Sequence, residues 1–246
     1  MLKIKKEEFY NRQTLLKELG LVGQQKLANA RIAVVGVGGL GCVSSLYLSL
    51  AGVGYIRLID YDTVKIHNLH RQILYTSGEL GQNKAEVAAE RLRKQNPFIK
   101  IEAVTDKVTE VNVKGLLSDV DCVVDGLDNL LTRYLVNHAC VKMQVPYIFG
   151  AATGLEGNLS VFSPPETGCL ECIMPKELVN IQKKSEFGII GATSGVIGTL
   201  QALETIKLLA GIGKLLKNEL MVYDFRDMNL TVVKIAKNSK CNVCSV

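Results

Sequence analysis

A doubly wound α/β domain built on a mostly parallel sheet is the fold class that the sequence predicts. Residues 31–36 (Arg-Ile-Ala-Val-Val-Gly) form an apolar run ending in glycine, which is typical of a strand covered on both faces. Similar short apolar runs alternate with helix-length segments as far as residue 150. Strands that alternate with helices through short connections indicate a parallel sheet with helices on both faces.

The spacing of apolar residues predicts the individual elements of this alternation. The chain begins with one or two short helices within residues 8–30, before the first strand. Strands are expected at residues 31–36, 55–60, 99–104, 121–125 and 147–150, and helices at residues 40–51, 84–95, 111–117 and 129–141. A long polar loop follows the second strand.

The last third of the chain has a different pattern. Residues 158–163, 220–224 and 230–236 predict antiparallel strands, which would extend the sheet at one edge. Residues 193–209 predict a buried helix, and the polar segment 175–187 between these elements is expected to be mobile. Because no linker separates the two patterns, we expect a single domain.

Composition restricts the class of protein. The chain has 246 residues, of which 48% are apolar and 22% charged, and its net charge is +5. No dense run of Lys and Arg suggests nucleic acid as a partner, and no apolar run is long enough for a membrane span. The charged N-terminus lacks the apolar segment of a signal peptide, so a cytoplasmic protein is expected.

A glycine motif after the first strand predicts nucleotide binding by a Rossmann-like sheet. It comprises Gly36, Gly38, Gly39 and Gly41 and opens the next helix, where backbone N–H groups favour phosphate. Asp60 closes the second strand, the position from which an acid binds ribose hydroxyls. The motif does not distinguish ATP from NAD, but no Walker-type P-loop sequence occurs, which excludes a P-loop ATPase.

Several longer motifs resemble the ThiF/MoeB/HesA family, prokaryotic relatives of the ubiquitin-activating enzymes. The most specific is the segment 60–72, Asp-Tyr-Asp-Thr-Val-Lys-Ile-His-Asn-Leu-His-Arg-Gln, followed by Gly-Gln-Asn-Lys at 81–84. Residues 10–13, 125–133 and 195–204 also match, so the resemblance covers nearly the whole chain. It implies an adenylyltransferase that uses ATP and Mg²⁺.

The resemblance also implies roles for individual residues. Arg71 and Lys84 would contact phosphate, and Asp128 would hold Mg²⁺, which prefers oxygen ligands. Asp128 could instead cap the helix that follows it. The residues implied in ATP binding are Gly36, Gly38, Gly39, Gly41, Asp60, Asn68, Arg71, Gln72, Lys84, Asp128 and Asn129. His67 and His70, in the same loop, are interpreted as structural residues.

Arg12 precedes the nucleotide-binding part of the chain. In the family that the chain resembles, the matching arginine reaches the active site of a neighbouring subunit, which implies a homodimer. Arg12 would then act with Arg71, Lys84 and Asp128 in catalysis. A solvated arginine on a helix surface is the alternative interpretation.

Two C-x-x-C pairs predict a metal site. Cys169 and Cys172 form the first pair, and Cys241 and Cys244 form the second. In a chain expected to be intracellular, this pattern indicates a tetrahedral Cys₄ zinc site, and the related family carries the same pairs as structural zinc. Redox activity of either pair is the alternative interpretation. Cys42, Cys122 and Cys140 are expected to be buried apolar residues.

The resemblance names a class of partner. It implies a small β-grasp (ubiquitin-like) carrier protein, whose C-terminal Gly-Gly carboxylate becomes adenylated as pyrophosphate is released. The single ThiF-like domain, 1–246, would divide into N-terminal helices (1–30), a nucleotide-binding part (31–150) and a carrier-binding, zinc-bearing part (151–246). Carriers of molybdopterin, thiamine, tRNA-thiolation or protein-conjugation pathways, or a short peptide, all remain open.

One position departs from the family pattern. Relatives commonly have a cysteine four residues before the glycine that matches Gly188, and this chain has Lys184. A covalent sulfur step is therefore not expected, and no sulfurtransferase domain is expected after Cys244. Two alternatives to the adenylyltransferase remain: a non-catalytic relative that binds a carrier, and an NAD-dependent oxidoreductase that uses the same glycine motif.

Overall fold

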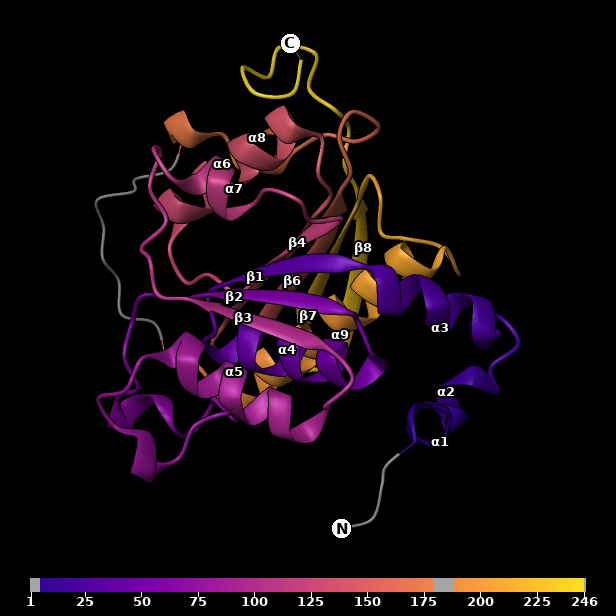
Figure 1. The fold of residues 1–246 in the computed structure, drawn as a ribbon. Coiled ribbons are helices and arrows are strands. Elements are labelled where there is room, and N and C mark those ends of the chain that lie inside the picture. Colours follow the sequence, from indigo (N-terminus) through magenta and orange to yellow (C-terminus); the bar gives the residue numbers. More distant parts are fainter. Residues whose placement is uncertain (1–4, 179–187, 246) are drawn as a thin grey trace.

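The computed structural model describes residues 5–178 and 188–245, which form one eight-stranded sheet between two layers of helices (Figure 1). The strand order is β3-β2-β1-β4-β5-β6-β7-β8. Strands β1 to β5 are parallel, and β6 to β8 pair antiparallel. The strands are β1 (Arg31–Val35), β2 (Tyr55–Ile59), β3 (Lys100–Val104), β4 (Cys122–Asp125), β5 (Tyr147–Thr153), β6 (Glu156–Phe162), β7 (Glu219–Asp224) and β8 (Asn229–Lys234). The predicted fold class is confirmed.

Helices cover both faces of the sheet, as the uniformly apolar first strand predicts. In Figure 1, α6, α7 and α8 lie on one face and α4, α5 and α9 on the other. Ile32 and Val34 of β1 join the core beneath α4, whereas Ala33 and Val35 join the core beneath α7. Successive side chains of a strand point to opposite faces, so both sets must be apolar. The helices are α3 (Gly20–Asn29), α4 (Gly39–Ala51), α5 (Lys84–Gln95), α6 (Val113–Leu116), α7 (Leu130–Met143), α8 (Leu170–Ile173) and α9 (Gly191–Ala210).

Asparagine side chains cap the N-termini of α5 and α7. Asn83 Oδ1 accepts the backbone N–H groups of Ala85 and Glu86 at 2.8 and 3.2 Å, so α5 begins at Lys84. Asn129 Oδ1 accepts the N–H of Thr132 at 2.9 Å, so α7 begins at Leu130, one residue after the predicted start at residue 129. Such caps satisfy N–H groups that have no partner inside the helix.

The N-terminal segment forms α1 (Lys6–Phe9) and α2 (Asn11–Thr14) in addition to α3, one helix more than predicted. It is attached to the C-terminal end of α4, where Gln13 Nε2 donates to Ala51 O at 2.7 Å. The buried Tyr10 hydroxyl accepts a hydrogen bond from Asn96 Nδ2 at 2.8 Å. These contacts place α2, the helix that contains Arg12, on the amino-end side of the parallel strands (Figure 1).

Strand order identifies where a ligand would bind. The chain proceeds from β1 outward to β3 and then returns to β4 on the other side of β1. The loops that leave β1 and β4 therefore diverge, and ligands bind at such a switch point, beyond the carboxyl ends of the strands. Two short 3₁₀ helices, η1 (Ile66–Asn68) and η2 (Ser77–Glu79), form the predicted polar loop beside this edge, and η3 (Lys176–Leu178) precedes residues outside the described range.

Among the described residues, none of the helices has the length and apolar character needed to cross a membrane. The division of the chain at residues 30 and 150 stays a prediction, although one sheet connects both sides of residue 150 through the β5–β6 pairing.

Candidate active site at the switch point

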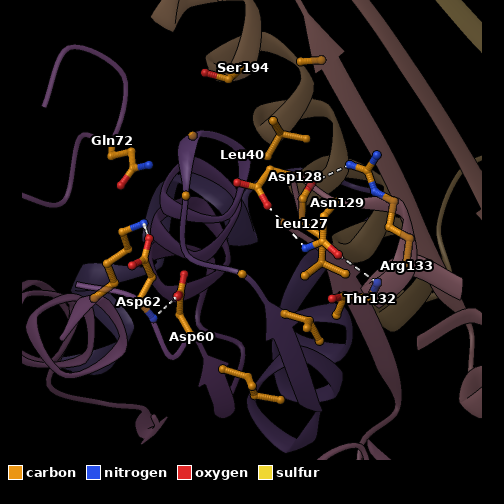
Figure 2. A pocket seen from close by; sticks show the side chains of 18 of the residues that line it. Leu40, Asp60, Asp62, Gln72, Leu127, Asp128, Asn129, Thr132, Arg133 and Ser194 are labelled. Atoms are coloured by element: carbon orange, nitrogen blue, oxygen red, sulfur yellow. Dashed lines mark hydrogen bonds and ion pairs between the residues drawn. The ribbon is translucent and has the colours of Figure 1, made fainter. Parts of the chain in front are cut away.

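A cavity of about 390 Å³ opens at the carboxyl ends of the parallel strands. Figure 2 shows Asp60 and Asp62 on one side of it and Asp128, Asn129 and Thr132 on the other. The predicted nucleotide-binding residues that line it are Gly36, Gly38, Gly39, Asp60, Arg71, Gln72, Lys84, Asp128 and Asn129. The cavity volume falls within the range of small-molecule sites.

The glycine loop joins β1 to α4 along the cavity wall. Gly36 has a φ of 87°, a backbone conformation that glycine adopts without strain. Gly41 does not line the cavity; a side chain there would lie 1.9 Å from Gly36 O, so this glycine lets α4 pack against the loop. Gly38 and Gly39 present the N-terminus of α4 to the cavity, where free N–H groups favour an anion.

Asp60 braces the glycine loop. Its Oδ2 accepts the N–H of Val37 at 2.7 Å, and its Oδ1 accepts the N–H of Asp62 at 2.9 Å. Burial raises the pKa of Asp60, while these two N–H groups and the nearby Lys84 oppose that increase. Each carboxylate oxygen has more than one lone pair, so the hydrogen bonds to Val37 and Asp62 leave acceptor capacity for ribose hydroxyls.

Asp62 holds Lys84 in the cavity wall, a role that the sequence reasoning missed. Asp62 Oδ2 lies 2.9 Å from Lys84 Nζ, and Asp62 Oδ1 lies 3.0 Å from Lys65 Nζ. Lys84 is only 5% exposed although it is charged. The sequence signal for this role was the acid–x–acid spacing of Asp60 and Asp62, followed further along the chain by Lys84. Because Asp62 orients Lys84, it belongs to the site.

The Asp62 carboxylate should make folding stability depend on pH. Burial alone would raise its pKa, but hydrogen bonds from Lys84 and Lys65 lower it from 3.8 to about 2. A depressed folded-state pKa stabilises the fold above the unfolded value, and this stabilisation is lost as the pH falls through about 2. Asp62→Asn should therefore lower the free energy of unfolding at pH 7, with a difference from wild type that shrinks below about pH 4.

Urea unfolding between pH 7 and pH 2 would measure this dependence. Asp227→Asn is a matched control, because Asp227 is exposed and forms no ion pair within the described residues. A constant difference between Asp62→Asn and wild type across this pH range would contradict the assignment.

Arg71 and Gln72 follow η1 in the polar loop. Arg71 Nη1 donates to His67 O at 2.8 Å and lies 2.7 Å from His70 Nε2, so both histidines support the arginine. Gln72 is buried, and its Oε1 has no hydrogen-bond partner in the described part of the chain. Asn68 does not line the cavity; its Oδ1 accepts the N–H of Lys65 at 3.2 Å and shapes the loop.

Asp128 is exposed on the loop between β4 and α7. The capping role considered for it belongs to its neighbour Asn129. Within the described residues, the carboxylate accepts one hydrogen bond, from Asn129 Nδ2 at 3.5 Å. An exposed carboxylate at the cavity wall, free of a helix cap, remains able to hold a hard cation.

A buried ion pair supports the loop that carries Asp128. This pair was not predicted from the sequence. Arg133 Nε lies 3.0 Å from Oδ2 of the fully buried Asp125. Arg133 Nη2 donates to Leu127 O at 2.6 Å and to Gly150 O at 2.9 Å. These bonds connect the residue before Asp128 to β5. Asp125 and Arg133 both belong to the family motif at residues 125–133, but only the fold shows that they form an ion pair.

Arg12 does not reach the cavity of its own chain. The neighbouring Gln13 contacts Ala51 at the C-terminal end of α4, whereas Gly39 at the other end lines the cavity. The 13 residues of α4 span about 20 Å, at 1.5 Å per residue. Arg12 is exposed, as either a residue for a neighbouring subunit or a solvated side chain would be.

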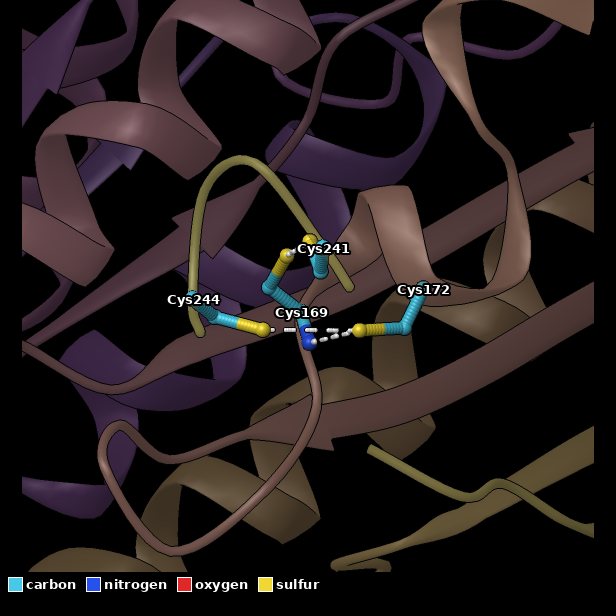
Figure 3. A group of neighbouring side chains, drawn as sticks. All are labelled: Cys169, Cys172, Cys241 and Cys244. Atoms are coloured by element: carbon cyan, nitrogen blue, oxygen red, sulfur yellow. Dashed lines mark hydrogen bonds between the residues drawn. The ribbon is translucent and has the colours of Figure 1, made fainter. Parts of the chain in front are cut away.

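The four cysteines of the two C-x-x-C pairs come together, as predicted (Figure 3). Their sulfur atoms all lie within 4.8 Å of one another, with Cys169–Cys241 at 3.7 Å and Cys172–Cys244 at 3.4 Å. A tetrahedral zinc with Zn–S bonds of about 2.3 Å has sulfur–sulfur distances of about 3.8 Å. The N–H groups of Cys169 and Asn238 also point to Cys172 Sγ, each at 3.5 Å. This arrangement could hold zinc.

The other cysteines are buried, as expected. Cys42, Cys122 and Cys140 are at most 2% exposed. Burial raises the pKa of the Cys42 thiol to about 12 and raises the pKa of the other two as well, so all three remain protonated and unreactive. Lys184, the position of the predicted departure from the family pattern, lies outside the described residues.

Together, the switch-point cavity, the glycine loop at the start of α4 and the surrounding cations form the arrangement expected of a Rossmann-like α/β domain. The chain belongs to the ThiF family, whose model matches residues 10–243. The predicted family resemblance is therefore confirmed.

Named relatives share most of this chain. The adenylyltransferase and sulfurtransferase MOCS3 of Culex quinquefasciatus is 41% identical over 239 residues, which are 96% of this chain and 55% of that protein. The sulfur carrier protein adenylyltransferase of Thermus thermophilus is 40% identical over 248 residues, covering 97% of this chain and 92% of that protein. The chain thus spans about half the length of the MOCS3 relative, and both relatives are named as adenylyltransferases.

Solved structures show the same fold. Escherichia coli MccB with MccA-N7isoASN superposes with a TM-score of 0.88 at 24% identity, covering 99% of this chain and 76% of that one. MccB with ATP superposes with a TM-score of 0.83 at 25% identity, covering 91% of this chain and 68% of that one.

Proposed function

We propose that this protein uses ATP to adenylate the C-terminal glycine carboxylate of a small β-grasp carrier protein and releases pyrophosphate. One observation carries the proposal: a single cavity collects Asp60, the glycine loop, the cations Arg71 and Lys84, and the exposed Asp128. A ribose-binding acid, a phosphate-binding loop, fixed positive charge and a metal-binding acid are the components that adenylation of a carboxylate needs.

The proposed reaction transfers AMP to the carrier. A carboxylate oxygen attacks the α-phosphorus, a new O–P bond forms, and the bond to the bridging oxygen breaks, so pyrophosphate leaves with that electron pair. No base is required, since a C-terminal carboxylate is already ionised near neutral pH. Negative charge builds up on the phosphates as the two anions meet. Arg71 and Lys84 would stabilise this charge from fixed positions.

The remaining residues would position ATP. Asp60 would accept the ribose hydroxyls while holding the glycine loop, and Gly36, Gly38 and Gly39 would admit the phosphates close to the backbone. Gly41, Asn68, Gln72 and Asn129 would support this surface as packing, loop or capping residues. Asp128 would hold Mg²⁺, whose charge would offset that of the phosphates, because its carboxylate is exposed at the cavity wall and has no ion pair within the described residues.

The wall formed by β5 supports a glycine tail as the second substrate. Ala151, Ala152 and Thr153 line the cavity next to Gly188 and Ile189, and most of their side chains are small. A carrier tail without side chains would fit beside them. The Thermus thermophilus relative is named for a sulfur carrier protein, which supports a carrier of this type.

ATP–pyrophosphate exchange tests the function directly. Purified protein, ATP and labelled pyrophosphate should show exchange that depends on a carrier ending in Gly-Gly and on Mg²⁺, whereas a carrier without its last glycine should be inactive. Carrier binding without exchange would favour the non-catalytic relative. Reduction or oxidation of NAD without exchange would favour an oxidoreductase, which leaves the roles of Arg71 and Lys84 unexplained.

The proposed role of Arg12 in the cavity of a second subunit predicts a homodimer with shared sites. If Arg12 completes the cavity of a second copy, mixing Arg12→Ala with Asp128→Ala should restore activity, because a mixed dimer has one site with both residues intact. Random exchange of subunits would restore up to about a quarter of wild-type activity.

A second mixture provides the control for this complementation. Arg71 and Asp128 line the same cavity of one chain. Mixing Arg71→Ala with Asp128→Ala therefore leaves every site incomplete and should restore nothing. If mass spectrometry shows subunit exchange but the Arg12→Ala mixture stays inactive, Arg12 has no role across the interface.

A further inference from the structure

The hydroxyl of Tyr75 connects two segments that line the cavity, the glycine loop and the start of α5. Tyr75 is 5% exposed, and its oxygen lies 2.8 Å from Val37 O and 3.2 Å from Lys84 O. Val37 belongs to the glycine loop, and Lys84 is the first residue of α5. A single O–H group therefore bonds to the loop and lies against the helix that carries the buried cation.

The backbone of Tyr75 adds a third connection. Its N–H donates to Gln72 O at 3.1 Å. The N–H groups of Arg71 and Gln72 in turn donate to Asn68 O at 3.1 and 3.0 Å, which closes the turn that bears Arg71. Tyr75 is therefore in contact with all three elements proposed to face the phosphates: the glycine loop, the Arg71 turn and the start of α5.

The Val37 peptide shows how Tyr75 would act on the loop. Asp60 Oδ2 holds the N–H of Val37 at 2.7 Å, and the Tyr75 hydroxyl holds its carbonyl, which also accepts a weak bond from Cys42 Sγ at 3.3 Å. That carbonyl shares a planar trans peptide with the N–H of Gly38, so the two groups point in opposite directions. The Gly38 N–H has no partner within the described residues, and Gly38 lines the cavity.

We propose that Tyr75 is a positioning residue for the phosphate end of the nucleotide site: its hydroxyl sets the orientation of the Gly38 N–H relative to Lys84 and Arg71. This inference rests on the proposed binding of ATP in the cavity. The proton needed for the bond is retained, because burial raises the pKa of Tyr75 far above its ordinary value. A preset donor needs no reorganisation when the triphosphate arrives.

Tyr75→Phe tests this role, because it removes the hydroxyl and keeps the ring that packs in the core. Tyr134→Phe is the matched control: Tyr134 is also buried, and its hydroxyl donates to a backbone carbonyl, Met174 O at 3.0 Å, away from the cavity lining. Calorimetric titration with adenosine, AMP and ATP would be run on wild type and both variants, alongside thermal unfolding.

Tyr75→Phe should weaken ATP binding about tenfold, which corresponds to one buried hydrogen bond, and should leave adenosine binding unchanged. AMP should lie between them, since the loss grows with the number of phosphates. Both variants should lower the unfolding temperature by similar amounts, since each loses one buried hydrogen bond. Tyr134→Phe should leave the affinities for adenosine, AMP and ATP at wild-type values. Unchanged adenosine binding also demonstrates that the variant site is folded.

Two results would overturn the inference. If Tyr75→Phe weakens the binding of adenosine and of ATP equally, the variant has a general structural defect. If Tyr75→Phe binds ATP as tightly as Tyr134→Phe does, the Tyr75 hydroxyl does not position the loop. Failure of the proposed function looks different: wild-type protein would then bind ATP no more tightly than adenosine, before any variant is considered.

Discussion

Replacing Lys84 with alanine is expected to lower ATP–pyrophosphate exchange by roughly a hundredfold or more, the usual effect of removing a preorganised electrostatic group. The Lys84 side chain is nearly buried and lines the cavity, and its Nζ lies 2.9 Å from Asp62 Oδ2. Water cannot easily replace a cation at such a site. Arg71→Ala and Asp128→Ala should have comparable effects, whereas Asp60→Ala should mainly raise the Kd for ATP.

Lys65 offers a matched control for this experiment. It pairs with the same carboxylate, Asp62, at 3.0 Å, but its side chain is half exposed and does not line the cavity. Lys65→Ala should therefore keep most of the exchange activity. Equal loss in both variants would indicate that Asp62 and its ion pairs matter for folding alone. Full activity of Lys84→Ala would contradict the phosphate-binding role.

Removal of zinc is expected to have the second large effect, on stability. We expect about one zinc ion per chain by elemental analysis, because four sulfur atoms lie at distances suited to a tetrahedral ion. The site joins the segment at Cys169 to the C-terminal segment at Cys241, 72 residues later. Binding free energy at such a site contributes to folding, so chelation should markedly lower the unfolding temperature.

Cysteine variants separate this effect from general damage. Cys241→Ser should lose zinc and unfold at a lower temperature, whereas Cys140→Ala, which changes a buried cysteine outside the cluster, should retain zinc. A metal-free preparation with the full unfolding temperature of the zinc-bound protein would refute the structural role. Adenylation should decline only as far as the fold does, since no position in a Cys₄ site remains open for substrate.

Sequence alone was sufficient for the features that depend on local pattern. The predicted helix at residues 84–95 matches α5 (Lys84–Gln95), and the first strand ends within one residue of its prediction. Apolar spacing reports these elements because burial on one or two faces imposes a period on the side chains. The glycine motif, Asp60 and the C-x-x-C pairs are equally local, and each was recognised by its spacing.

Tertiary structure decided which residues meet. Residues from different elements meet in three places: Asp62 pairs with Lys84, Arg133 contacts Asp125 and Gly150, and the Tyr75 hydroxyl bonds to Val37 O. The structure also assigned the cap of α7 to Asn129 and placed Arg12 away from the cavity of its own chain. Such contacts depend on how strands order in the sheet and where loops reverse the chain. That arrangement minimises exposed apolar surface over the whole molecule, so no short stretch of sequence contains it.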